Sequence, residues 1–122
     1  MADAQTLFDA RAFQGSYYLA GYAIECALKA CIAKRTREFD FPEKREVERS
    51  YTHDLNRLLE VAKLESVLGE EIGNDDELGR NWATVRVWSE GSRYALDVSE
   101  ESAQNMLAAI RDGILPWLKK RW

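Results

Sequence analysis

Apolar residues recur at helical spacing through most of the chain. One face is formed by residues at alternating intervals of four and three positions: Tyr17, Gly21, Ile24, Leu28 and Cys31. This spacing is typical of a helix with one buried face, and it predicts a long helix over residues 17–34. A shorter helix is expected over residues 3–13. We interpret Gly15 and Ser16 as the break between the two helices, with Ser16 as a cap.

A third helical pattern follows a charged connector over residues 39–51, within which residues 43–50 could form a short exposed helix. The pattern predicts a helix over residues 52–68, with Thr52 as its N-cap. The inner face of this helix is expected to consist of Leu55, Leu58, Leu59 and Ala62.

Two more helices are predicted in the last part of the chain. Residues 74–77 resemble a capping box, in which asparagine is followed three positions later by glutamate. They predict a helix over residues 75–88. Ser99 is expected to cap the last helix, over residues 99–119. The segment between these helices, residues 93–98, is interpreted as extended or loop-like.

Composition places the chain among small globular proteins. Its 122 residues are 46% hydrophobic and 31% charged, which suits one domain over residues 1–122 with one core. Two prolines and seven glycines are too few for a turn-rich all-β fold, so the domain is expected to be all-α. The net charge of −4 disfavours a dedicated binder of duplex DNA, which would usually be basic.

The cysteines and the apolar stretches indicate a compartment. Cys26 and Cys31 point roughly 140° apart on a helix and cannot form a disulfide with each other. With a single histidine and no Cys-x-x-Cys pair, no metal or other cofactor is predicted. Free thiols and the lack of a visible signal peptide predict a cytoplasmic location. The most apolar stretch, residues 17–33, contains Glu25 and Lys29 and is too short to span a membrane.

Three segments, in this order and spacing, resemble recurring elements of the HEPN family, named for higher eukaryotes and prokaryotes nucleotide binding. The first is YLAGYAIECALKA, residues 18–30, and the second is THDL, residues 52–55. In the third, Trp82 and Arg86 are followed by the Ser-Arg-Tyr run of residues 92–94. The alignment that places all three covers most of the chain.

The resemblance implies an antiparallel bundle of four to five helices that is often a homodimer. It also implies frequent pairing with a small nucleotidyltransferase, in toxin–antitoxin or defence systems. Many members of the family are ribonucleases that need no metal and carry an arginine followed, four to six residues later, by a histidine.

This chain departs from that ribonuclease pattern. Its single histidine is His53, far from the expected place. Six residues stand between Arg86 and the next arginine, Arg93, and that position holds no histidine. An arginine stays protonated near neutral pH and cannot act as a general base. The usual ribonuclease mechanism of the family is therefore not expected.

The residues best suited to binding a ligand are Arg86, Arg93 and Tyr94. Arginine binds phosphate through two parallel hydrogen bonds, and aromatic rings stack on bases. The alternative is structural: Trp82 and Trp88 would belong to the core, and the arginines would pair with acids. The acids nearest in sequence are Glu90, Asp97 and Glu100.

Glu25, Lys29 and His53 have two interpretations each. Glu25 and Lys29 are spaced as an ion pair on one helix and are either structural or part of a polar patch that contacts a ligand or partner. His53 is either hydrogen-bonded locally near its helix start or a group that moves a proton during RNA cleavage.

Three hypotheses for function follow. The preferred one is a HEPN-like binding module for RNA, a nucleotide or a nucleotidyltransferase, with Arg86, Arg93 and Tyr94 at the site. The second is a metal-independent ribonuclease, in which an arginine stabilises the charge at phosphorus and His53 moves the proton. The third is a structural dimerisation domain, in which the alanines between residues 20 and 30 pack helix against helix.

Overall fold

The structure is a computed structural model that describes residues 1–38, 48–95 and 97–122. These residues form helices and no strand, which confirms the all-α prediction. The elements in chain order are α1 (Ala2–Asp9), α2 (Phe13–Glu38), α4 (Leu55–Val61), α5 (Glu65–Ile72), α6 (Asp76–Val85), the 3-10 helix η1 (Glu90–Tyr94), α7 (Glu100–Ala109), the π-helical turn η2 (Ile110–Ile114) and α8 (Leu115–Lys119).

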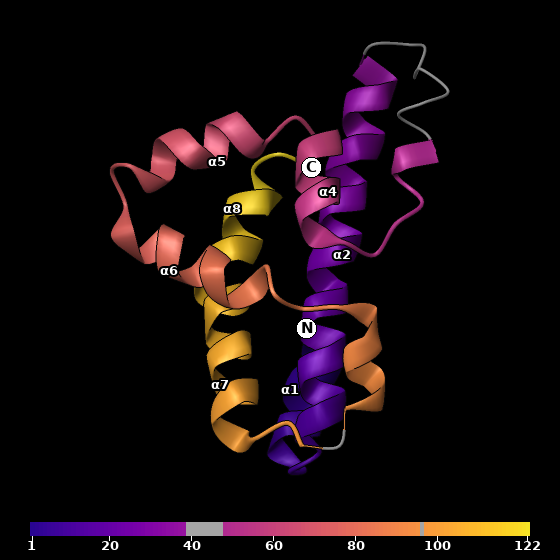
Figure 1. The fold of residues 1–122 in the computed structure, drawn as a ribbon, viewed down its shortest axis with the longest axis vertical. Helices are drawn as coiled ribbons and strands as arrows, with labels where there is room; N and C mark the ends of the chain where they lie inside the picture. The colour runs from indigo at the N-terminus through magenta and orange to yellow at the C-terminus, as the bar shows by residue number, and fades with distance from the viewer. Residues whose placement is uncertain (39–47, 96) are drawn as a thin grey trace.

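The long helix α2 is the centre of the fold. It contacts α1, α4 and η1 and also α7, η2 and α8, which follow one another as one almost continuous rod (Figure 1). The predicted inner face is confirmed at Ile24, Leu28 and Cys31, which are buried. Small residues allow the close approach of the neighbouring helices, since Ala20 and Ala27 are also buried.

The predicted break before α2 is wrong. The helix begins at Phe13 and continues through Gly15 and Ser16. Ser16 is fully buried, and its hydroxyl donates to the Ala4 carbonyl at 2.8 Å, so it joins α2 to α1 instead of capping a helix. The chain turns earlier, at Arg11, whose φ of 64° lies in the left-handed region.

The helix predicted over residues 52–68 is two helices, α4 and α5. They are separated at Lys63, which has a φ of 60°. The N-cap of α4 is Asp54, whose carboxylate accepts from the Asn56 and Arg57 amides. Thr52, the predicted cap, accepts from the Asp54 amide instead. The predicted inner face of Leu55, Leu58, Leu59 and Ala62 is buried and therefore confirmed.

The later helices agree better with the pattern. The cap of α6 is Asp75, one residue after the predicted Asn74. Ser99 caps α7 as predicted, by accepting from the Ser102 amide. The 93–98 segment is only partly loop, because η1 extends to Tyr94. Residues 39–47 of the connector, which include most of the short helix expected over residues 43–50, and residue 96 lie outside the described residues.

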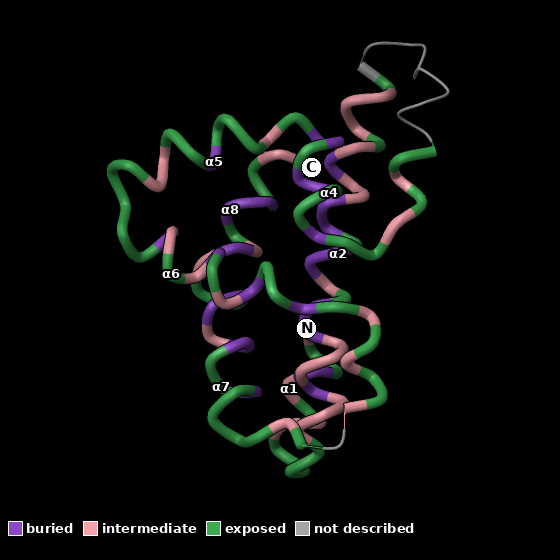
Figure 2. Tube along the Cα trace, viewed as in Figure 1, coloured by how far each residue is buried: buried purple, intermediate pink, exposed green. Residues whose placement is uncertain are grey.

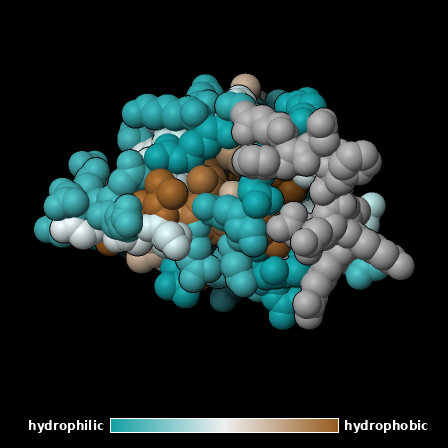
Figure 3. Space-filling model, turned by 90° about the horizontal axis from the view of Figure 1, so that it is seen from above, coloured by the Kyte–Doolittle hydropathy of each residue, from teal (hydrophilic) through white to brown (hydrophobic). Residues whose placement is uncertain are grey.

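The helices α5 and α6 form an arm at the upper left of Figure 1, and much of it is exposed (Figure 2). Leu68 is the buried residue of α5. Seen from above, the same end of the molecule has a hydrophilic rim around an apolar patch (Figure 3). No helix in the described part of the chain is both long and apolar enough to span a membrane.

Candidate functional site

Glu25 is a charged residue buried in the middle of α2, with 1% of its surface exposed. Its Oε2 lies 3.8 Å from the Lys29 Nζ, so the ion pair expected from the sequence forms. A carboxylate without partners is costly to bury. The lysine contact is long and half-exposed, which leaves room for a second partner.

His53 is that second partner. Its Nδ1 lies 2.5 Å from the Glu25 Oε1, across 28 positions of sequence. The turns on either side fix the place of the ring, because Thr52 and Asp54 use their side chains to shape the chain that enters α4. The interpretation of His53 as a residue bonded locally near a cap is therefore wrong.

The other nitrogen of the His53 ring meets a second carboxylate. Nε2 lies 3.1 Å from the Glu90 Oε2, at the start of η1. The side chains of His53 and Glu90 are 46% and 42% exposed, so this outer contact is open to water and the contact with Glu25 is not. Both ring nitrogens of His53 thus face a carboxylate oxygen, one on α2 and one on η1.

These side chains border a cavity of about 410 Å³, which we call the His53 cavity. Its lining comes from two segments, the entry to α4 and the turn after α6. The lining residues are Thr52, His53, Asp54, Asn56, Arg86, Trp88, Ser89, Glu90 and Gly91. Two stretches far apart in sequence are thus brought to one place by their packing on α2.

Arg86 lines the His53 cavity and is not paired with a carboxylate of any described residue. Its backbone is held, because the Asn56 side chain donates to the Arg86 carbonyl at 3.3 Å. Its guanidinium makes no ion pair with any residue that the structure describes. Arg86 therefore keeps its donors for a ligand, and arginine presents them in a geometry that matches phosphate.

Arg93 and Tyr94 lie at the far end of η1 and do not line the His53 cavity. The Arg93 guanidinium lies over the Tyr94 ring, 5.0 Å from its centre, and the tyrosine is 73% exposed. The Gln14 side chain donates to the Arg93 carbonyl and ties η1 to α2. The three residues predicted as one site are therefore divided between an arginine in the cavity and a stacked pair outside its lining.

The structural alternative for this region is half right. Trp82 and Trp88 are core residues, as it predicts. The acids, however, pair with other groups: Glu90 contacts His53, and Glu100 lies 3.8 Å from the Arg11 guanidinium. Neither Arg86 nor Arg93 is paired with a carboxylate in the described part of the chain.

Trp88 anchors the turn that carries the cavity. The tryptophan is 3% exposed, and its ring packs on Gly21 and stacks at 6.1 Å on the Tyr18 ring. Its Nε1 and the Ser92 hydroxyl are buried without a hydrogen-bond partner among the described residues. Each such group costs about 1–3 kcal/mol, so packing of the Trp88 ring, and not hydrogen bonding of these two groups, holds the turn in place.

Comparisons with models of known protein families, with curated proteins and with solved structures found no match. The geometry of the molecule therefore carries the functional argument.

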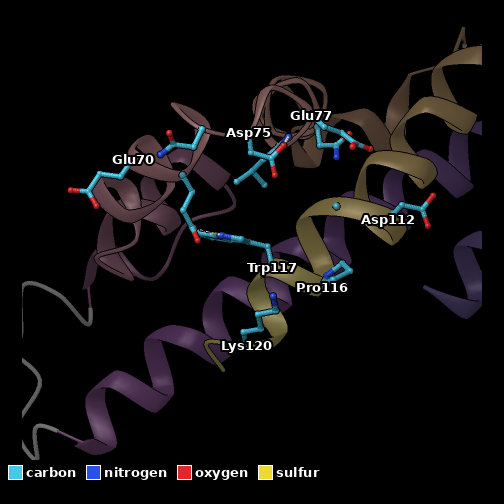
Figure 4. A pocket seen from close by; sticks show the side chains of 12 residues that line it. Glu70, Asp75, Glu77, Asp112, Pro116, Trp117 and Lys120 are labelled. Carbon is cyan, nitrogen blue, oxygen red and sulfur yellow. Dashed lines mark hydrogen bonds between the residues drawn. The ribbon is translucent and has the colours of Figure 1, made fainter.

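A larger cavity of about 630 Å³ lies between the arm of α5 and α6 and the rod of η2 and α8 (Figure 4). Carboxylates dominate its rim, with Glu70, Asp75, Glu77 and Asp112 around one cation, Lys120. Its floor is fixed, because Trp117 Nε1 and the Arg121 guanidinium both donate to Glu71. An acidic rim of this kind repels phosphate and other anions.

The alanine stripe of α2 divides between the core and a groove. Ala23 and Ala30 are half-buried and line a cavity of about 540 Å³ together with Met1, Leu115 and Trp122. The exposed Cys26 also lines this groove, whereas Cys31 is buried and donates to the Leu118 carbonyl at 3.8 Å. Burial raises the pKa of the Cys31 thiol, which suits a structural cysteine.

Sequence reasoning found Glu25, Lys29, His53 and Arg86 but did not join them into one site. It treated Glu90 only as a counterion for arginine, whereas its partner is His53. The position of Glu25 was the signal that could have joined them. A glutamate in the middle of the apolar face of α2 needs a cationic partner when it is buried, and His53 is the single histidine of the sequence.

Proposed function

We propose that this chain is a HEPN-like module that binds RNA at the His53 cavity. The observation that carries the proposal is the unpaired Arg86 guanidinium beside a histidine held by a buried carboxylate. A phosphate group would accept from both Arg86 and His53. The resemblance of the sequence to the HEPN family favours the same class of ligand.

The stacked pair beside the cavity suits the next part of an RNA strand. Arg93 and Tyr94 are exposed on η1, on the same continuous segment that supplies Arg86 and Glu90. Exposed tyrosine and arginine planes stack on unpaired bases and bind single strands with little preference for sequence. The proposed ligand is therefore single-stranded RNA, with a phosphate at Arg86 and a base at Tyr94.

Replacing Arg86 with alanine is expected to weaken binding of a short fluorescent single-stranded RNA by about tenfold, because one phosphate contact is lost. The slope of log affinity against log salt concentration should fall by about 0.7, the value for one phosphate on a single strand. Adding Arg93→Ala is expected to abolish binding. Fluorescence anisotropy at several salt concentrations measures both quantities.

Arg80→Ala is the matched control, since Arg80 is an exposed arginine of the same helix region that lines no cavity described above. It should leave both the affinity and the slope unchanged. Equal losses in the Arg80 and Arg86 variants would mean that general charge attraction, and not the cavity, binds RNA. If a free nucleotide competes fully with the RNA, the ligand that the site recognises is a single nucleotide.

A metal-independent ribonuclease is the second candidate, because of the contact between Glu25 and His53. A buried carboxylate on Nδ1 fixes the orientation of the ring, as in hydrolases where histidine moves protons. Arg86 in the same cavity could stabilise charge on phosphorus. A ribose 2′-oxygen would bond to phosphorus and give its proton to His53, while the bond from phosphorus to the 5′-oxygen breaks and that oxygen takes a proton from water. The products would be a 2′,3′-cyclic phosphate and a free 5′-hydroxyl.

For an enzyme, His53→Gln should lower cleavage of RNA in excess chelator by roughly 100-fold or more, the usual share of acid–base catalysis. Glutamine still offers Glu25 a donor, so the variant is expected to stay folded. Electrophoresis of labelled RNA measures the cleavage. Equal cleavage by the wild type and this variant would remove His53 from the chemistry, and uncleaved but bound RNA would leave the binding module alone.

Partners other than RNA stay predictions from the family resemblance. A homodimer is expected from it, and light scattering of the purified protein tests that state directly. A nucleotidyltransferase is the expected protein partner. If neither arginine substitution changes the binding of RNA, and the protein binds such an enzyme, a module that recognises protein only is favoured.

A further inference from the structure

We propose that the Glu90 carboxylate fills an anion-binding site beside His53, and that a phosphate group binds at this site by displacing the carboxylate. The inference deepens the proposed RNA binding at the same cavity and rests on it for the natural ligand. It assigns to Glu90 the control of how tightly that ligand is held.

The geometry of His53 defines the place. Its Nδ1 is committed to the buried Glu25, so Nε2 is the nitrogen that faces the open side. The atom on that side is the Glu90 Oε2, at 3.1 Å. A phosphate oxygen is an acceptor of the same kind, so it can replace a carboxylate oxygen without a change at His53.

The distribution of charge favours the exchange. Glu25 keeps both Lys29 and His53 as partners, whether or not Glu90 is present. Glu90 contacts His53 alone among the described cations, and Arg86 in the same cavity has no carboxylate. A phosphate that displaces Glu90 would gain Arg86 as well as His53, so it makes fuller use of the two cations.

The segment that carries Glu90 is a short 3-10 helix with buried polar groups left unpaired. Trp88 Nε1 and the Ser92 hydroxyl lack hydrogen-bond partners within the described residues. The backbone of the segment is held on α2 by the packing of Trp88 on Gly21 and Tyr18 and by the Gln14 contact with the Arg93 carbonyl, so only the Glu90 side chain has to move. Displacement of Glu90 therefore breaks one solvent-exposed contact.

The experiment titrates inorganic phosphate into the wild type, Glu90→Gln and the control Glu101→Gln. Because His53 is the single histidine, its ring signals in NMR spectra report the site without overlap. Glu90→Gln is expected to bind phosphate about fivefold more tightly or better, the effect of removing one nearby unit charge in a water-like medium. Glu101 is exposed on α7, so Glu101→Gln should match the wild type. Adding Arg86→Ala to Glu90→Gln should remove the gain.

The outcomes separate this inference from the proposed function. If Glu90→Gln binds phosphate no better than Glu101→Gln, or if phosphate leaves the His53 signals unmoved, the inference is overturned, even where RNA still binds through Arg86. If phosphate moves the His53 signals and binds more tightly to Glu90→Gln, the anion site stands. Failure of the wild type and of Glu90→Gln to bind RNA would then refute the RNA proposal only.

Discussion

Replacing His53 with alanine is expected to lower the free energy of unfolding by about 3 kcal/mol, the cost of leaving a buried charge without its partner. The ring makes the short contact to the Glu25 carboxylate, which is 1% exposed. Lys29 remains, but its Nζ is 3.8 Å away on a half-exposed side chain. A histidine that is itself 46% exposed would otherwise be expected to matter little.

The reverse substitution is the test of this reasoning. Glu25→Leu removes the buried charge and leaves His53 and Lys29 free to face water, so it should cost no more than about 1 kcal/mol. In the Glu25→Leu background, His53→Ala should then cost little. Urea unfolding followed by circular dichroism gives the four values of the cycle. A cost below about 0.5 kcal/mol for His53→Ala alone, as at an ordinary surface position, would contradict the importance of the contact.

This asymmetry bears on the role of Glu25. If leucine is nearly as good for stability, packing does not explain a glutamate in the middle of the central helix. What the glutamate does, and leucine cannot, is hold the His53 ring with Nε2 facing the cavity. The residue is therefore better understood as positioning His53 than as holding α4 to α2.

The buried faces of the helices could be predicted from sequence, because burial itself sets the spacing of apolar residues. The predicted faces of α2 and α4 are buried almost completely, as are the tryptophans of the structural alternative. The ends of helices were harder to predict. Arg11 and Lys63 turn the chain with positive φ, a conformation that sequence patterns usually assign to glycine. At the start of α4, neighbouring Thr52 and Asp54 both form cap-like bonds, and only geometry selects Asp54.

The candidate site was predictable residue by residue but not as a set. Lys29 was found as the partner of Glu25 because helical spacing fixes that contact. The contacts of His53 with Glu25 and Glu90 join three elements, and no local pattern encodes such distances. The sequence offered arginine as the partner of Glu90. The fold gives it histidine, and so leaves Arg86 unpaired.

Gly21→Ala is expected to lower the free energy of unfolding by about 2 kcal/mol, because the added methyl group would overlap a buried ring. A Cβ at this position would lie 2.2 Å from the Trp88 Cδ1 and 2.4 Å from its Nε1. The ring has little room to move, since it is 3% exposed and packed against Tyr18. The gain of about 1 kcal/mol in helix propensity offsets only part of this cost.

Gly69→Ala separates crowding from helix propensity. Gly69 lies inside α5, and a Cβ there would meet no atom within 4 Å, so this variant should be more stable than the wild type by about 0.5–1 kcal/mol. Urea unfolding of both variants measures the difference. Because Trp88 lies between Arg86 and Glu90, Gly21→Ala should also weaken RNA binding, and Gly69→Ala should not. Equal stability of the two variants would mean that Trp88 does not sit on Gly21, and would remove the anchor of the His53 cavity.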